Sequence, residues 1–298
     1  MISAKPWRLE AVARLLLSII ACVLTGSLLE SVLHYSSAGG KTSAKFFYPA
    51  AAAAFGCLAG TLALLRQPWR LDNLMRRLLT ALSCLYASFL VGAWVQHGAG
   101  AAEVSTRQMI ISILSFQGAG MVLIACLLRE YGEGWAEAFG LRNQWGHALL
   151  LGAIIASLFL PMGWALEEAS ALVLKKLPAL GLQPEVQPAV QVLQQATSWA
   201  SRGALGLVTI LLAPVGEELL FRGTLYPWVK QAGFPRLALW GTSAGFAAIH
   251  LNLGVFVPLL ALALILTALY ERTNNLLAPI AAHSMFNALN FATLYLHK

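Results

Sequence analysis

Long apolar stretches separated by short polar segments make up most of this chain. An α-helix needs about 20 mainly apolar residues to cross a bilayer, and nine stretches reach or approach that length. They cover residues 12–33, 46–65, 78–96, 108–128, 146–166, 203–229, 236–252, 254–270 and 276–296. The seventh is short enough to be a half-span. The pattern predicts an all-α, polytopic integral membrane protein with eight or nine transmembrane helices.

The composition favours the same class. Hydrophobic residues make up 58% of the chain and charged residues only 11%, whereas soluble domains average about 45–50% apolar and about 25% charged residues. The net charge is +7, but the basic residues fall in short clusters between the apolar stretches. That distribution is typical of membrane topology. It indicates the lipid bilayer as a partner and gives no sign of a nucleic-acid partner.

The basic residues also predict an orientation. If the N-terminus is cytoplasmic, twelve Lys and Arg residues fall inside and seven outside, as the positive-inside rule requires. The first apolar run is long for a signal peptide and has no convincing cleavage site, so we interpret it as a retained span. One connection is long, residues 167–202, and its apolar stripe at helical spacing predicts a short helix on the membrane surface.

Three polar clusters interrupt the last apolar stretches. A charged group inside hydrocarbon costs about 2.5–3.5 kcal/mol on insertion scales, so such groups mark functional sites. In the first cluster, Glu218 and Arg222 are i,i+4 neighbours that can form an ion pair. Glu217 lies about 100° around the helix from Glu218, which leaves its carboxylate for chemistry. The structural alternative is a salt-bridged helix end.

The other two clusters carry imidazoles. Phe246 and His250 share one helical face, so the aromatic ring can hold the imidazole, and His283 and Asn287 share a face of the last span. Each pair alone is explained as well by contacts between neighbouring helices. Together, three helices supply carboxylates, two imidazoles and a carboxamide. A hydrolase needs a base that activates water and donors that stabilise an oxyanion, and these groups provide both.

The order E-E-x-x-x-R, F-x-x-x-H and H-x-x-x-N on separate late spans resembles the CPBP family. That family groups CAAX prenyl endopeptidases with bacterial abortive-infection and bacteriocin-processing or immunity proteins. The resemblance covers roughly residues 205–298. It divides the chain into residues 1–202, which hold N-terminal transmembrane helices and the surface connection, and residues 203–298, which hold CPBP-like catalytic helices.

The resemblance implies an intramembrane endopeptidase with its active site between helices. Glu217 would activate the attacking water with assistance from His250, and His283 and Asn287 would stabilise the tetrahedral oxyanion. The supporting residues would be Glu218, Arg222 and Phe246.

The family has been described both as metalloproteases and as glutamate-dependent proteases. Because this chain lacks H-E-x-x-H, we favour the glutamate type without a cofactor. A zinc ion held by Glu217, His250 and His283 is the open alternative. The implied substrate is a membrane-embedded or lipid-anchored protein or peptide, and the implied location is a multi-pass position in the bacterial inner membrane.

Two other classes of function fit parts of the pattern. The first is a non-catalytic membrane protein of the bacteriocin-immunity type, which would bind a peptide on the same scaffold. The second is a transporter or proton relay, since ionisable residues inside spans also mark ion paths. The order of the three motifs favours a protease over a transporter. The intact motif residues favour chemistry over binding alone.

Overall fold

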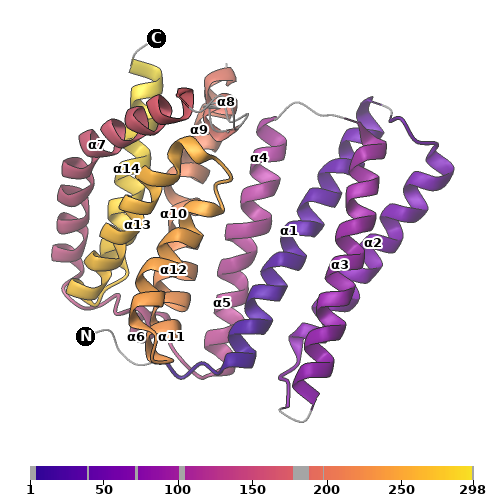
Figure 1. Cartoon of the computed structure of the whole chain (residues 1–298), viewed down its shortest axis with the longest axis horizontal. Helices are drawn as coiled ribbons and strands as arrows, with labels where there is room; N and C mark the ends of the chain where they lie inside the picture. Colours follow the sequence, from indigo (N-terminus) through magenta and orange to yellow (C-terminus); the bar gives the residue numbers. More distant parts are fainter. Residues whose placement is uncertain are drawn as a thin grey trace. The chain divides into compact units, whose positions relative to one another are not determined.

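The computed structural model describes residues 5–38, 40–70, 73–100, 105–176, 188–196 and 198–296. Within these ranges every regular element is helical (Figure 1), which confirms the predicted all-α class. The chain forms two compact units. The N-terminal unit is Trp7–Leu127, and the C-terminal unit combines Met1–Pro6 with Leu128–Lys298.

The N-terminal unit is built on three long helices followed by a helix that is briefly π-helical. In chain order these are α1 (Leu9–Ala38), α2 (Ala44–Arg66), α3 (Leu74–Ala99), α4 (Thr106–Ile113), η2 (Leu114–Gly118) and most of α5 (Ala119–Glu130). Helices α1, α2 and α3 contact one another pairwise. Their core includes the buried side chains of Phe47, Leu58 and Val95, and Tyr35 stacks on Phe47 with ring centroids 3.7 Å apart.

The C-terminal unit contains the three late clusters. Its elements are α6 (Trp135–Phe139), α7 (Trp145–Lys175), α8 (Pro188–Gln195), α9 (Trp199–Leu207), η4 (Val208–Leu212), α10 (Ala213–Glu218), η5 (Leu219–Leu225), α11 (Tyr226–Gln231), α12 (Pro235–Ala248), α13 (Leu253–Thr273) and α14 (Leu277–Leu296). Helix α7 packs against both α13 and α14. Buried Phe159, Leu262, Leu266 and Ala282 form the core between them.

Seven helices in the described part of the chain are long and apolar enough to cross a membrane. Helix α12 is the short seventh stretch of the sequence, and its 14 residues reach only about 21 Å. Helix α14 has 20 residues, but the polar side chains of His283, Ser284 and Asn287 lower its hydropathy. The polytopic membrane fold is therefore confirmed, with seven clear spans and α14 as a more polar helix of spanning length.

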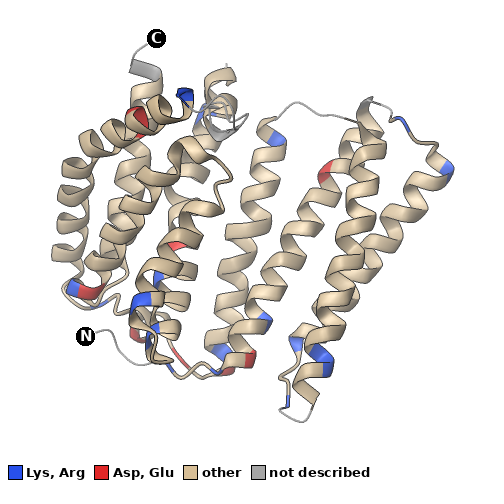
Figure 2. Ribbon diagram, viewed as in Figure 1, with Lys and Arg blue, Asp and Glu red and all other residues tan. Residues whose placement is uncertain are grey.

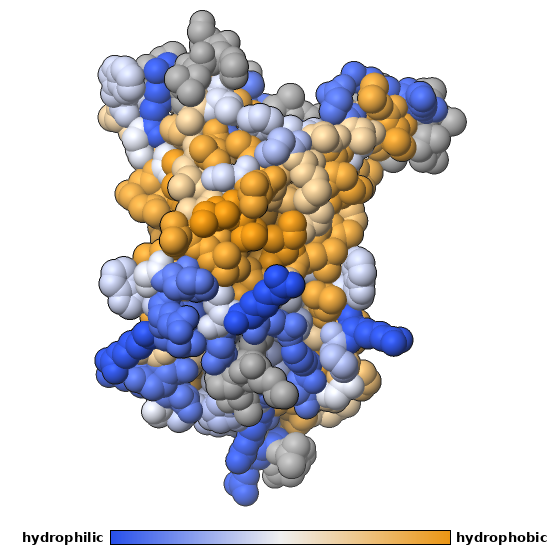
Figure 3. Space-filling model, turned by 90° about the vertical axis from the view of Figure 1, so that its left-hand side faces the viewer, coloured by the Kyte–Doolittle hydropathy of each residue, from blue (hydrophilic) through white to orange (hydrophobic). Residues whose placement is uncertain are grey.

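The surface of the molecule agrees with a membrane environment. Most charged residues lie near the ends of the helices (Figure 2). On the face that includes α7, a hydrophobic zone separates two hydrophilic ends (Figure 3). Exposed α7 side chains such as Leu150, Leu158 and Trp164 are apolar because lipid, and not water, is their solvent.

The long connection differs in part from the prediction. Helix α7 continues through Glu167 and Glu168 to Lys175, so the connection begins later than the polar residues suggested. A short helix is present at Pro188–Gln195, where Val192 and Leu193 are buried. Part of the predicted stripe, including Val186, lies outside the described residues.

The N-terminal residue Lys5 is anchored to the C-terminal unit. Its backbone N–H donates to the Gln231 side chain at 2.9 Å, its ammonium group donates to the Ala138 carbonyl, and the ammonium lies over the Phe139 ring. Burial lowers the pKa of Lys5 to about 8, although the carboxylate of Glu133 acts in the opposite direction. These contacts explain why Lys5 belongs to the same unit as α6 and α11.

Small residues set the spacing between α7 and α14. A Cβ atom added to Gly152 would lie 2.5 Å from the Ala278 carbonyl oxygen and 2.9 Å from the Ala281 Cβ. Only glycine permits this approach, which is the usual way in which membrane helices pack closely. Because α14 carries His283, this contact also fixes the position of the third cluster.

We expect Gly152→Ala to destabilise the protein by about 1–3 kcal/mol, since the new methyl group overlaps backbone atoms that cannot move independently. Gly146→Ala, on the same helix, is the matched control because an added Cβ there meets nothing within 4 Å. Thermal unfolding of both variants in detergent measures the difference. Equal unfolding midpoints for the two variants would contradict the close packing of α7 on α14.

Candidate active site

The helix that carries Glu217 and Glu218 is irregular. Pro214 and Pro227 lack the N–H that an α-helix requires, and each ring crowds the carbonyl four residues earlier. Those carbonyls belong to residues 210 and 223, which lie in the π-helical segments η4 and η5. The widened turns relieve the crowding, and π-helical turns occur frequently at functional sites. The two carboxylates lie between these segments, at the end of α10.

The carboxylate of Glu218 is the centre of the polar network. Its residue is 0% exposed, and its Oε1 accepts hydrogen bonds from Arg222 Nη1 at 2.8 Å and His283 Nδ1 at 2.9 Å. Arg222 Nη2 donates to the Ala263 carbonyl at 3.0 Å. The ion pair expected from the i,i+4 spacing is therefore present, and it joins the carboxylate helix to α13 and α14.

His283 lies between the two glutamates. Since Glu218 accepts from Nδ1, that nitrogen carries a proton in this arrangement. The opposite nitrogen, Nε2, is 3.9 Å from Glu217 Oε2, which is too long for a hydrogen bond. Both Glu217 and His283 are buried. The Nε2 side of the imidazole ring is therefore directed toward Glu217, while Glu218 binds the Nδ1 side.

The ring of Phe246 connects the cluster. It is fully buried, and the Arg222 guanidinium lies 4.5 Å from its centroid. The rings of His250 and His283 lie 5.2 and 5.6 Å from the same centroid. The contact predicted between Phe246 and His250 is therefore observed. One aromatic side chain positions both imidazoles and the guanidinium that neutralises Glu218.

His250 lies in the turn that follows α12 and is oriented by the backbone. Its Nδ1 lies 2.8 Å from the Phe246 carbonyl oxygen. A carbonyl can only accept, so Nδ1 carries a proton, and in the neutral imidazole Nε2 has the lone pair. The next residue, Leu251, has a left-handed backbone with φ of 50° and is 93% exposed. The turn that terminates the helix thus places a hydrogen-bond-accepting imidazole at its end.

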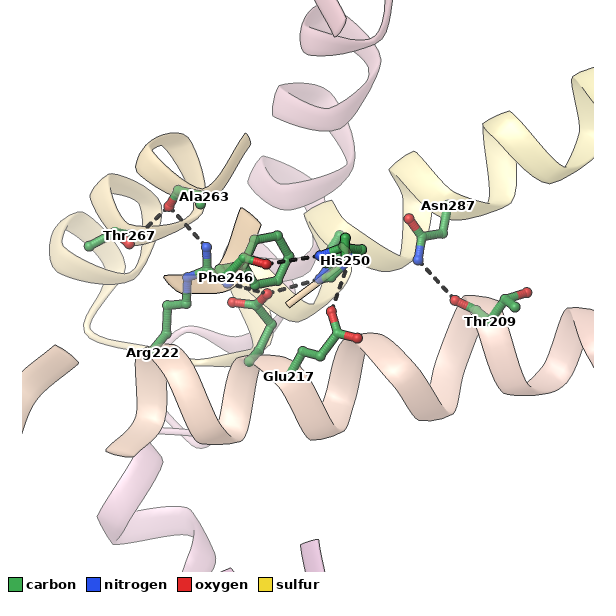
Figure 4. A network of polar contacts seen from close by, with 10 residues as sticks. Thr209, Glu217, Arg222, Phe246, His250, Ala263, Thr267 and Asn287 are labelled. Atoms are coloured by element: carbon green, nitrogen blue, oxygen red, sulfur yellow. Dashed lines mark hydrogen bonds and ion pairs between the residues drawn. The ribbon is translucent and has the colours of Figure 1, made fainter. Parts of the chain in front are cut away.

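Asn287 makes a different contact. Its side-chain nitrogen donates to the Thr209 carbonyl at 2.9 Å, and Thr209 lies in the π-helical segment η4. Figure 4 shows the Asn287 side chain directed toward Thr209, and Asn287 lies one helical turn after His283 on α14. The hydrogen bond satisfies a backbone carbonyl in the widened turn. A primary amide nitrogen has two N–H bonds, and this contact uses one.

The structure thus brings most of the predicted site residues together. Glu217, Glu218, Arg222 and His283 form one network, and His250 adjoins it through Phe246 (Figure 4). Sequence reasoning missed the Ala263 and Thr209 carbonyls, because backbone acceptors leave no side-chain signal. Ser243 lies three residues before Phe246 on the same face of α12. Its buried hydroxyl makes no hydrogen bond to any residue that the structure describes.

The residues proposed for zinc do not form a ligand set here. Within the described ranges no three His, Cys, Asp or Glu side chains are placed to hold one metal ion. Nδ1 of His283 is held by Glu218, and His250 contacts the Phe246 ring. The observed geometry is that of a hydrogen-bonded network.

Comparison with known proteins agrees with this site. Residues 199–289 match the family described as type II CAAX prenyl endopeptidase, Rce1-like. The family resemblance is confirmed. The matched segment contains all three motifs, from Glu217 to Asn287.

One curated relative matches part of the chain. An uncharacterized protein, YpbD, of Bacillus subtilis (strain 168) is 34% identical over 86 residues, which is 28% of this chain and 41% of YpbD. The chain therefore spans less than half of the length of the relative it matches. No solved structure matches the chain.

The Rce1-like segment and the compact units have different boundaries. The segment begins at residue 199, close to the division predicted after residue 202, whereas the compact units divide between Leu127 and Leu128. Helix α7 causes the difference. It precedes the family match, yet it packs on α13 and α14 and so belongs structurally with the site.

We expect Arg222→Met to cost about 3–5 kcal/mol of stability, because it leaves a buried carboxylate without its counter-charge. Lys230→Met is the matched control, since the Lys230–Glu271 pair has side chains that are each 38% exposed and such pairs contribute about 0–1 kcal/mol. Denaturant or thermal unfolding of both variants in detergent gives the comparison. A small and equal effect for both would show that the Glu218–Arg222 pair does not hold the helices together.

Proposed function

We propose that this protein is an intramembrane endopeptidase that hydrolyses a peptide bond in a membrane-embedded or lipid-anchored protein or peptide. The observation that carries the proposal is the placement of a buried Glu217 carboxylate 3.9 Å from the Nε2 of an imidazole, His283, whose other nitrogen is held by Glu218. The Rce1-like scaffold supports the same reaction class.

Glu217 is the base in this proposal. Glu218 already accepts hydrogen bonds from Arg222 and His283, so its charge is balanced by the guanidinium. Glu217 is separated from His283 by more than a hydrogen bond, which allows both groups to contact one water molecule. Glu217 removes a proton from that water while the water oxygen bonds to the carbonyl carbon. The electron pair of the carbonyl moves to its oxygen and forms the oxyanion.

The second half of the reaction returns the proton. The Glu217 carboxylic acid protonates the amine nitrogen, the carbon–nitrogen bond breaks, and the oxyanion collapses to the new carboxyl group. The carboxylate is regenerated. Each bond formed is matched by one broken, and the net reaction consumes one water molecule. No redox partner is required.

The two imidazoles have separate roles. Nδ1 of His250 is bound to the Phe246 carbonyl, so its Nε2 lone pair can accept a hydrogen bond from the attacking water and assist Glu217. His283 is flanked by two carboxylates. When Nε2 carries a proton it donates to the oxyanion while Nδ1 stays on Glu218, as an acidic partner holds a catalytic imidazole in serine proteases.

Asn287 would be the second oxyanion donor. One N–H of its amide is used by the Thr209 carbonyl, and that bond fixes the side chain on α14, one helical turn from His283. The remaining N–H is the group that we assign to the oxyanion. Two donors of this kind, preorganised in a site that excludes bulk water, are the usual source of a large part of the rate enhancement.

The mechanism proposed is glutamate-dependent. It rests on the arrangement of the side chains, in which the Nδ1 atoms of both imidazoles are committed to protein acceptors and the Glu217 carboxylate lies near Nε2 of His283. Because the family that the motifs resemble includes bacterial proteins, we propose a location in the bacterial inner membrane. The order of the three motifs favours a protease over a transporter or proton relay.

We expect Glu217→Gln to reduce cleavage by about 10²–10⁴-fold, because the amide keeps the shape of the side chain but cannot accept a proton. Glu168→Gln is the matched control, since Glu168 is an exposed glutamate outside the site. The assay follows cleavage of a prenylated C-terminal peptide, and of native membrane proteins by terminal-peptide mass spectrometry, in liposomes containing each variant. Full activity of Glu217→Gln with an unaltered fold would remove Glu217 as the base.

Chelators separate the glutamate mechanism from the zinc alternative. We expect the wild-type enzyme to keep its activity after treatment with EDTA or phenanthroline, because no catalytic group in this proposal depends on a metal. Cleavage in the same liposomes, before and after dialysis into metal-free buffer, is the measurement. Loss of activity that added zinc restores would overturn the glutamate mechanism and leave the protease assignment standing.

A further inference from the structure

A polar cavity of about 560 Å³ lies in the N-terminal unit, outside the Rce1-like segment. Its walls come from α1, α3, α4 and the connection that precedes α2. They include Ser27, Glu30, His34, Lys41, His97 and Gln108. The helices that enclose it are otherwise apolar enough to be membrane spans. Neither the packing of these helices nor the proposed proteolysis explains a polar cavity between them.

The cavity lies toward one end of the helices. Successive spans alternate in direction, so the end of α1, the start of α2, the end of α3 and the start of α4 come together (Figure 1). Glu30 is eight residues before the end of α1, which is about 12 Å of helix. His97 lies in the last turn of α3. A hollow at this position is within reach of lipid headgroups at the membrane interface.

The wall of the cavity is well anchored. The backbone N–H groups of Lys41 and Thr42 donate to the Gly98 carbonyl at 2.8 and 3.3 Å, and Tyr35 donates to the Thr42 carbonyl at 2.7 Å. A Cβ added to Gly98 would lie 2.6 Å from the Thr42 hydroxyl. These contacts fasten the α1–α2 connection onto the end of α3, so the site is formed before a ligand arrives.

Two residues that line this cavity each have a buried acceptor atom with no donor in the described part of the chain. Glu30 is only 8% exposed. Its Oε1 accepts from Arg107 Nε at 3.3 Å and Nη2 at 3.2 Å, whereas its Oε2 makes no hydrogen bond to any residue that the structure describes. The side-chain oxygen of Gln108 is in the same condition. Buried acceptors of this kind carry a desolvation penalty until a donor reaches them.

The chemistry of the wall selects the ligand. A carboxylate oxygen and an amide oxygen that both need donors suit a protonated primary amine, which has three N–H bonds. Lys41, His34 and His97 line the same cavity and suit an anionic group beside the amine. A metal ion does not fit, since no three suitable side chains in the described ranges converge on one point.

We propose that the N-terminal unit binds a protonated primary amine carried next to a phosphate, as in a phosphoethanolamine headgroup. The ammonium group donates to Glu30 Oε2 and to the Gln108 oxygen. The phosphate contacts the Lys41, His34 and His97 side chains that line the same cavity. The source is a membrane phospholipid or a free phosphoethanolamine compound. Binding at this site does not depend on the proposed protease reaction.

The test measures binding to the purified full chain by native mass spectrometry. Phosphatidylethanolamine is compared with phosphatidylcholine of identical acyl chains, since the trimethylated amine has no N–H to donate. Loss of one charge-assisted hydrogen bond weakens binding by about tenfold to a hundredfold, so we expect at least about a tenfold preference for phosphatidylethanolamine. Free phosphoethanolamine and phosphocholine, added as competitors, show whether the ligand is the lipid or the soluble compound.

Variants locate the effect. Glu30→Gln should abolish the preference for the primary amine, whereas Glu10→Gln, on the same helix but outside the cavity, should retain it. If Glu30→Gln does not fold, Gln108→Leu decides, because it removes the second acceptor without removing a charge. Equal binding of ethanolamine and choline headgroups by the wild type would overturn the proposal. An unchanged preference in the folded Glu30 or Gln108 variant would overturn it as well.

Discussion

The carboxylate of Glu218 is the group on which the rest of the C-terminal unit depends. It is fully buried, and a single oxygen accepts hydrogen bonds from Arg222 on its own helix and from His283 on α14. Arg222 then reaches the backbone of α13 and stacks on Phe246 of α12. An ionised carboxylate cannot stay in such surroundings without compensation, so four helical segments are obliged to keep their relative positions around it.

This constraint gives the two adjacent glutamates different roles. Glu218 is committed to holding helices together, and its charge is balanced where it lies. Glu217, its neighbour in sequence, projects from another side of the helix and faces His283 at a longer distance. Preorganisation of this type is what active sites require, because groups that are already oriented do not have to reorganise during the reaction.

The local part of the site could be predicted from the sequence, and the long-range part could not. The Glu218–Arg222 pair and the Phe246–His250 contact are i,i+4 neighbours, so helical geometry alone brings them together. The hydrogen bond from His283 to Glu218 joins residues 65 positions apart, and no periodicity specifies it. The contact of Asn287 with Thr209 depends on a backbone carbonyl. In the N-terminal unit, Ser27, Glu30 and His34 share a face of α1, but without motif spacing they gave no signal of a cavity.

The π-helical segments on either side of the carboxylates have a consequence for the length of the chain. Each such segment holds about one residue more per turn than an α-helix, so removing one residue can restore regular α-helical winding with little net rotation of the flanking turns. In Val208–Leu212 that change would return the Thr209 carbonyl to the ordinary i to i+4 backbone pattern, in place of its bond from Asn287. The number of residues in each π-helical segment is therefore as much a part of the site as the kinds of residue that the site contains.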